Sequence, residues 1–148
     1  MAAIRVPEEA MVISTHTLTG GCHCGALRYE CAAPVSKPAI CHCTSCRRTS
    51  GAQSVAWMSV KRAAFKLLSG TPREYVSSEK VVRSFCEQCG CSLTYAHSKY
   101  PDELDLTIAS LDDPSAIAPT AHIWMSDAAS WDRPGDDLPQ HAGWRGAT

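Results

Sequence analysis

The sequence lacks an excess of charge of either sign and lacks any long apolar run. Its 148 residues carry a formal net charge of -1, and the basic residues are not gathered into the run that binding to a phosphate backbone favours. No apolar stretch approaches the roughly 20 residues that a membrane-spanning helix needs. Pro7, Glu8 and Glu9 interrupt the N-terminal segment before an apolar signal-peptide core could form. We therefore expect a cytoplasmic protein that binds neither nucleic acid nor a membrane.

The chain also lacks internal repeats, low-complexity blocks and a linker long enough to divide it. A length of 148 residues with 45% hydrophobic content suits a single compact domain with its own core. We expect residues 20–139 to form that domain. Residues 1–19 are expected as an N-terminal tail or edge segment, and residues 140–148 as a C-terminal tail.

The pattern along the chain is typical of a mainly antiparallel β protein. Short runs rich in Val, Tyr, Trp and Ile alternate with Gly, Pro, Ser and Asp. They predict strands at 26–31, 54–60, 65–69, 73–76, 81–85, 92–96, 103–109 and 121–124. A short helix is expected over 44–49, capped by Thr44 or Ser45, and another over 111–115. The proline-rich segment 34–38 is expected to be a surface turn.

Cysteine is the residue that the chain has in excess. Cys31 is expected to pack as a small apolar residue, whereas most of the others are separated from the next cysteine by only one or two residues, which directs two sulfurs toward one centre, as a shared metal requires. A disulfide framework is the competing interpretation. The odd count and the absence of an export signal disfavour it. The nine cysteines are Cys22, Cys24, Cys31, Cys41, Cys43, Cys46, Cys86, Cys89 and Cys91.

Two short motifs predict a closed metal site. They are Gly-Cys-His-Cys-Gly at 21–25 and Phe-Cys-Glu-Gln-Cys-Gly at 85–90. The glycine after each pair lets the backbone adopt a positive φ, so that main-chain N–H groups turn toward the sulfurs. Four thiolates complete the tetrahedron of a structural zinc, with His23 expected to face solvent as a spacer. The predicted ligands of this structural zinc are Cys22, Cys24, Cys86 and Cys89.

A third motif predicts an open metal site. Residues 41–46 offer three sulfurs without a nearby fourth cysteine, which leaves a coordination position free, as in catalytic zinc sites. A soft thiol is the group best suited to that position, where it would lose its proton and become a nucleophile. The predicted ligands of this catalytic zinc are Cys41, Cys43 and Cys46.

The neighbours of the third motif leave alternatives open. Arg47 and Arg48 either bind carboxylates of an anionic substrate or lie solvated on the surface. Trp57 either walls the substrate pocket or packs in the core. His42 is either a fourth ligand or general base, or it points away from the metal. Cys91 either closes the open site as a fourth ligand or lies elsewhere.

These motifs resemble those of the glutathione-dependent formaldehyde-activating enzyme family, also called the centromere protein V family. The matching segments run from Gly20 to about Pro139 and include 41–48 with Gly51. The resemblance implies an Mss4-like β-tent of antiparallel sheets with zinc sites and few short helices. It also implies a structural zinc on the four-cysteine set and a catalytic zinc on the three-cysteine set. The implied activity is that of a carbon-sulfur lyase joining glutathione, or another small thiol, to formaldehyde as S-(hydroxymethyl)glutathione.

Two other functions compete with the lyase. A non-catalytic zinc-binding module of the Mss4-like class would bind a protein partner, and it requires a closed second site with Cys91 or His42 as the fourth ligand. A methionine sulfoxide reductase has a similar scaffold but needs a nucleophilic cysteine beyond the zinc site. No cysteine follows Cys91, which disfavours the reductase.

Overall fold

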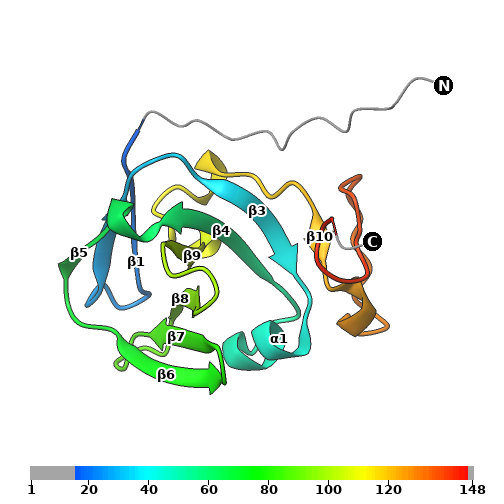
Figure 1. The fold of residues 1–148 in the computed structure, drawn as a ribbon, viewed down its shortest axis with the longest axis horizontal. Coiled ribbons are helices and arrows are strands. Elements are labelled where there is room, and N and C mark those ends of the chain that lie inside the picture. The colour runs from blue at the N-terminus through cyan, green and yellow to red at the C-terminus, as the bar shows by residue number, and fades with distance from the viewer. Residues whose placement is uncertain (1–15, 147–148) are drawn as a thin grey trace.

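The computed structural model describes residues 16–146, which fold into two β-sheets with one α-helix and four 3-10 turns (Figure 1). The predicted mainly β class is confirmed. The strands are β1 (Leu18–Gly21), β2 (Arg28–Cys31), β3 (Ser36–Cys41), β4 (Val55–Lys61), β5 (Phe65–Ser69), β6 (Arg73–Ser78), β7 (Val81–Phe85), β8 (Ser92–His97), β9 (Glu103–Thr107) and β10 (His122–Ile123). The helix is α1 (Thr44–Ser50), and the 3-10 turns are η1 (Arg62–Ala64), η2 (Ile108–Ser110), η3 (Pro114–Ala116) and η4 (Met125–Asp127).

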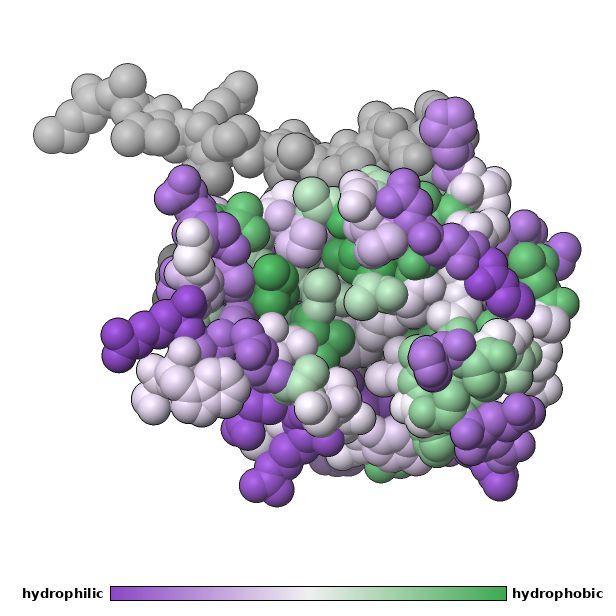
Figure 2. Space-filling view, turned by 180° about the vertical axis from the view of Figure 1, so that it is seen from behind, coloured by the Kyte–Doolittle hydropathy of each residue, from purple (hydrophilic) through white to green (hydrophobic). Residues whose placement is uncertain are grey.

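The two sheets differ in size. The smaller has the order β1-β2-β5, and the larger has the order β10-β3-β4-β9-β8-β7-β6. Strand pairs in both are antiparallel, apart from the parallel pair of β10 with β3. Figure 1 shows the small sheet at one end and the large sheet curving from β3 round to β6. Seen from behind, the surface carries hydrophobic side chains in separate groups among hydrophilic ones (Figure 2).

The large sheet uses its two faces differently. Successive side chains of a strand point to opposite faces. On β4 and β9 one set of alternate residues is apolar, and it packs into the main core together with residues of the small sheet. This set comprises Met58, Val60, Leu104 and Leu106. The other face is therefore free to carry polar side chains.

Residues 34–38 were expected as a surface turn, and that expectation is wrong for β3. Ser36–Cys41 is an inner strand of the large sheet, paired with both β4 and β10. The pairing with β4 is irregular between Ser36 and Ala39, so Pro38, which has no N–H to donate, sits at a bulge. The Pro38 carbonyl accepts a hydrogen bond of 2.9 Å from the N–H of Thr120. The bulge is what allows a proline inside this strand.

Helix α1 forms where it was expected, but its capping residue is different. Cys43, and not Thr44 or Ser45, is the N-cap, and its Sγ accepts a hydrogen bond of 3.3 Å from the N–H of Cys46. The thiol thus takes the role that a hydroxyl or carboxylate usually plays at this position. None of the helices in the described part of the chain is long and apolar enough to span a membrane.

The C-terminal part of the described chain packs against β10. The N–H of Trp124 donates to the carbonyl of Gly143 at 3.0 Å, and that of Met125 donates to the carbonyl of His141 at 3.0 Å. An isolated bridge also joins His122 to Gln140. These bonds bring the last described residues close to the end of β3, where the three-cysteine motif lies.

Candidate functional site

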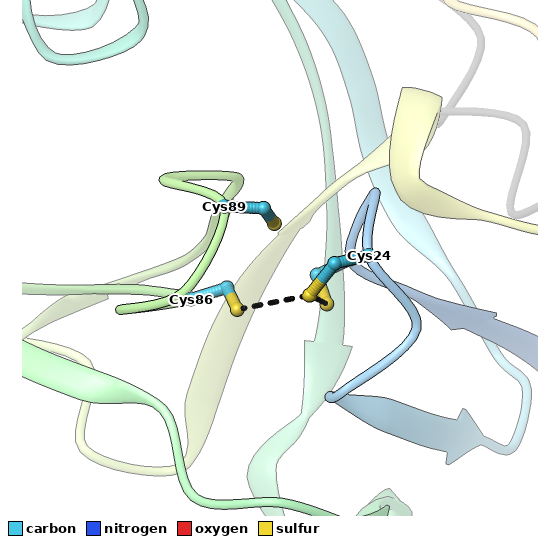
Figure 3. Close-up of side chains that lie close together, drawn as sticks. Cys24, Cys86 and Cys89 are labelled. Carbon is cyan, nitrogen blue, oxygen red and sulfur yellow. Dashed lines mark hydrogen bonds between the residues drawn. The ribbon is translucent and has the colours of Figure 1, made fainter.

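The first cysteine cluster joins two turns that are far apart in the sequence. Cys22 and Cys24 lie in the turn between β1 and β2, whereas Cys86 and Cys89 follow β7 (Figure 3). The four sulfurs lie within 4.8 Å of one another. The Cys24 sulfur is 3.5 Å from that of Cys22 and 3.8 Å from that of Cys86. The sequence motifs are therefore brought together as the prediction required.

This spacing fits a tetrahedral metal site. Four zinc–sulfur bonds of about 2.3 Å place the sulfurs about 3.8 Å apart. Backbone N–H groups also turn toward the sulfurs, as in the hydrogen bond of 3.2 Å from Leu27 to Cys22. A hydrogen bond from the backbone of Cys91 is the main cause that lowers the pKa of the Cys89 thiol to about 6. Both Gly25 and Gly90 have a positive φ, as the motifs predicted.

The two remaining cysteines lie outside the second cluster. Cys31 is fully buried in the main core. Cys91 packs against the same core, where burial raises the pKa of its thiol and the nearby Cys89 and Cys22 raise it further. Cys91 therefore lies beside the first cluster and does not supply a fourth ligand to the second.

The second cluster is built by the end of β3 and the start of α1. Cys41 is the last residue of β3, Cys43 caps the helix, and Cys46 lies in its first turn. Their sulfurs lie within 4.8 Å of one another, and no other described residue completes the group. Contacts with Cys41 and Cys46 lower the pKa of the Cys43 thiol, whereas contacts with Cys43 and Cys46 raise that of Cys41. One thiolate thus forms readily, and further thiolates need a cation to offset their repulsion.

His42 lies between two of these cysteines but is engaged elsewhere. Its Nδ1 is 2.7 Å from Oδ2 of Asp132, and its Nε2 is 2.9 Å from Nδ1 of His122. All three side chains are buried. Because both ring nitrogens already have partners, His42 could bind a metal only by breaking one of these bonds.

A cavity of about 530 Å³ opens beside the second cluster, and all three cysteines border it. Its volume is within the range of small-molecule sites. Part of its wall is aromatic. The aromatic residues on the wall are Trp57, Tyr95, Tyr100, Trp124 and Trp144.

The floor of the cavity is the polar face of the large sheet. The strand register places one residue of each of four neighbouring strands directly opposite the next. These residues therefore form a row across β4, β9, β8 and β7, and all of them border the cavity. The row consists of Ser59, Asp105, Tyr95 and Arg83.

Asp105 and Arg83 are the charged members of the row. The Ser59 hydroxyl donates a hydrogen bond of 2.5 Å to Asp105, yet burial raises the pKa of the Asp105 carboxyl to about 6. Arg83 is 3% exposed, and its guanidinium carbon lies 4.9 Å from the ring centroid of Tyr95. Its Nη2 is 3.6 Å from the Sγ of Cys46, which places a buried cation directly against the second cluster.

The expected substrate-binding residues divide between two locations. Trp57 borders the cavity and also packs with Cys41 and Cys46. It is therefore both a wall of the pocket and a buried packing residue, the two interpretations that the sequence left open. Arg47 and Arg48 are not among the described residues that border the cavity. The sequence reasoning missed Arg83 and Asp105. Their signal was a charged residue directly beside an apolar one within a predicted strand, which marks a polar face because successive side chains point to opposite faces.

The fold and the site define a cysteine-rich, mainly β protein with two candidate metal centres, one enclosed by four sulfurs and one bordering a cavity. The chain belongs to the family of the glutathione-dependent formaldehyde-activating enzyme, whose model matches residues 17–127. A protein of Halomonas elongata, provisionally named a glutathione-dependent formaldehyde-activating enzyme, is 24% identical over 123 residues, which cover 77% of this chain and 78% of that protein.

A solved structure is similar in fold. The crystal structure of a Rhodobacter sphaeroides protein matches with a TM-score of 0.53 and 22% identity, covering 68% of this chain and 91% of that one. The Mss4-like β-tent that the sequence resemblance implied agrees with the two sheets described above.

Proposed function

We propose that this protein is a zinc-dependent carbon-sulfur lyase that joins glutathione to formaldehyde as S-(hydroxymethyl)glutathione. The observation that carries the proposal is the second cluster, in which three sulfurs border a cavity and no other described residue joins them. Three protein ligands around zinc leave a position for an exogenous group, and a soft thiol suits that position. The family supports the same reaction.

The donor sets of both clusters fit zinc. Cys22, Cys24, Cys86 and Cys89 would hold a structural ion, and Cys41, Cys43 and Cys46 would hold a second one. Zinc in the second set would supply a site at which a thiol binds as its thiolate.

The residues of the chain would prepare this site for the substrates. Trp57 and Tyr95 are walls of the cavity, and their rings limit the access of water to the sulfurs. The thiol sulfur forms a bond to the aldehyde carbon while the carbonyl π bond breaks. The carbonyl oxygen takes up one proton and the thiol gives up one, so the reaction needs no further reactant. Holding the two reactants together in the cavity would supply most of the rate.

The competing non-catalytic module requires a closed second site. Neither Cys91 nor His42 takes part in the second cluster, and this observation favours the lyase. A reducing compartment would keep the cysteines as thiols and glutathione in its active form, in keeping with the predicted cytoplasmic location.

Metal analysis combined with an adduct assay tests the proposal. Wild-type protein is expected to contain two zinc ions per chain and to accelerate adduct formation between glutathione and formaldehyde. Cys43→Ser is expected to retain one zinc ion and lose the activity. Cys31→Ser, which alters a buried cysteine outside both clusters, should retain both ions and the activity. Wild-type protein with two zinc ions and no acceleration would overturn the proposal.

A further inference from the structure

Arg83 is a buried cation with one guanidinium nitrogen that no described residue engages. Its Nε donates a hydrogen bond of 3.1 Å to the Ser77 hydroxyl, and its Nη2 contacts the Cys46 sulfur. Its Nη1 is buried without a hydrogen-bond partner among the described residues. Burying an unsatisfied donor of a charged group is costly, so its retention in a cavity wall points to a ligand that completes it.

None of the other charged groups that border the cavity, Asp127 included, is a hydrogen-bond partner of Nη1. The Lys37 ammonium pairs with the Glu103 carboxylate at 2.9 Å. Asp105 accepts its hydrogen bond from Ser59, and it lies on β9, whereas Arg83 lies on β7. Between these strands runs β8, whose Tyr95 ring stacks against the guanidinium. The anion that would complete Arg83 is therefore not supplied by these carboxylates.

The position of Arg83 restricts where that anion can lie. Nη1 and Nη2 share one carbon, and Nη2 is 3.6 Å from the Cys46 sulfur. A group bound by Nη1 is therefore only a few bond lengths from the three-cysteine cluster. An anion tethered to a thiol at that cluster would reach both sites at once.

We propose that the second site selects thiols that carry a carboxylate, and that Arg83 Nη1 donates a charge-assisted hydrogen bond to that carboxylate. This inference rests on the proposed function, because it assigns a thiol to the same cluster. It extends the proposal by naming the feature that separates accepted from rejected thiols. Glutathione, which has two carboxylates, belongs to the class.

Calorimetric binding of two similar thiols tests the inference. 3-Mercaptopropionate and 2-mercaptoethanol differ mainly in a carboxylate against a hydroxyl. Wild-type, metal-loaded protein should bind 3-mercaptopropionate about ten- to 100-fold more tightly, as one charge-assisted hydrogen bond in a buried site allows. Arg83→Gln should reduce this ratio to about one, and Arg83→Lys, which keeps the charge but loses the planar fork, should retain part of it.

Two controls separate recognition from damage to the cluster. Arg73→Gln removes an exposed arginine of β6 and should leave the ratio unchanged. The methyl ester of 3-mercaptopropionate removes the negative charge without altering the protein, and it should bind to wild type as weakly as 2-mercaptoethanol does. The ester therefore tests the inference even if the Arg83 variants lose their metal.

Several results would overturn the inference. Equal binding of the two thiols by wild type would do so, as would tight binding of the ester. Loss of the preference in Arg48→Gln together with its survival in Arg83→Gln would show that Arg48, and not Arg83, binds the carboxylate. Failure of the proposed function would look different, because the carboxylate preference would persist while glutathione and formaldehyde gave no accelerated adduct.

Discussion

His42 and His122 share a buried hydrogen bond, with His42 Nε2 lying 2.9 Å from His122 Nδ1. Each ring also faces a carboxylate, His42 that of Asp132 at 2.7 Å and His122 that of Asp136 at 3.0 Å. The chain of four groups contains three hydrogen bonds, and each bond needs one hydrogen. Two neutral imidazoles supply only two, so the chain is complete only when it holds one additional proton. This series of hydrogen bonds holds the His42 side chain in place between the cysteines of the second cluster.

Removing one imidazole ring from this series of hydrogen-bonded side chains should destabilise the protein. His122→Phe leaves the Nε2 of His42 without its partner in a buried location, which costs about 1–3 kcal/mol. The free energy of unfolding in urea measures the loss. His141→Phe, on the neighbouring C-terminal segment, serves as the control and should cost less. Equal losses for the two variants would show that the hydrogen-bond chain is not the cause.

Removing one sulfur of the first cluster should release a metal ion and lower the unfolding temperature. Cys86→Ser breaks a site that joins residues 62 apart in the sequence, as Cys24 and Cys86 are. We expect one zinc ion fewer per chain by elemental analysis and a lower thermal midpoint. Cys31→Ala also alters a fully buried cysteine and should cost core packing alone, with both metal ions retained. Retention of both ions by Cys86→Ser would contradict the assignment of this cluster as a metal site.

The stability of the protein should fall as the pH rises through the range in which Asp105 ionises. Burial raises the pKa of Asp105 from 3.8 to about 6, with nearby Glu103 raising it further and Ser59, Lys37 and Arg83 lowering it. Between these two values the folded chain holds a proton that the unfolded chain has released. The free energy of unfolding therefore decreases between pH 4 and pH 6, by at most about 3 kcal/mol, and then levels off.

A neutral side chain at this position should remove that dependence. Asp105→Asn is expected to flatten the decrease between pH 4 and pH 6, as measured by urea unfolding at closely spaced pH values. Asp102→Asn changes an exposed carboxylate close by and should keep the wild-type slope. A wild-type slope in Asp105→Asn would show that other groups cause the pH dependence.

Gly70 should tolerate no side chain. Its φ is +76°, and a Cβ placed there would lie 2.3 Å from the carbonyl oxygen of Ala26. Gly70→Ala is expected to lower the free energy of unfolding by about 2 kcal/mol or more, because the positive φ and the contact both oppose the methyl group. Gly135→Ala, where a Cβ would meet no atom within 4 Å, should cost much less. A loss in Gly70→Ala no larger than in the control would contradict the described turn.

Features that depend on short sequence patterns were predicted well. The two cysteine motifs around Cys22 and Cys86 specify their own turns, because each motif places two sulfurs and a glycine within a few residues. Strands such as β7 and β8 follow from local runs of strand-forming residues. The inner strand β3 was missed because a proline such as Pro38 is typical of a turn. The irregular pairing of β3 with β4 around Pro38 is what makes a strand possible there.

Features that depend on pairing between distant segments could not be predicted. Arg83 and Asp105 share the cavity because of the register of β7, β8 and β9, which no local pattern fixes. The partners of His42 lie 80 and 90 residues away in the sequence. The Cys43 cap was missed because its thiol was assigned to a metal alone, whereas it also accepts a backbone hydrogen bond from Cys46.

The division of the large sheet between an apolar and a polar face separates two kinds of evolutionary change. Substitutions at Ser59 or Tyr95 alter the cavity floor, whereas those at Met58 or Leu106 alter the interior between the sheets. Adjacent positions of the same strand, such as Met58 and Ser59, thus affect the core and the cavity separately. The cavity floor can therefore change while the interior that supports the fold stays constant. A sheet divided in this way allows a site to vary without loss of the scaffold that holds it.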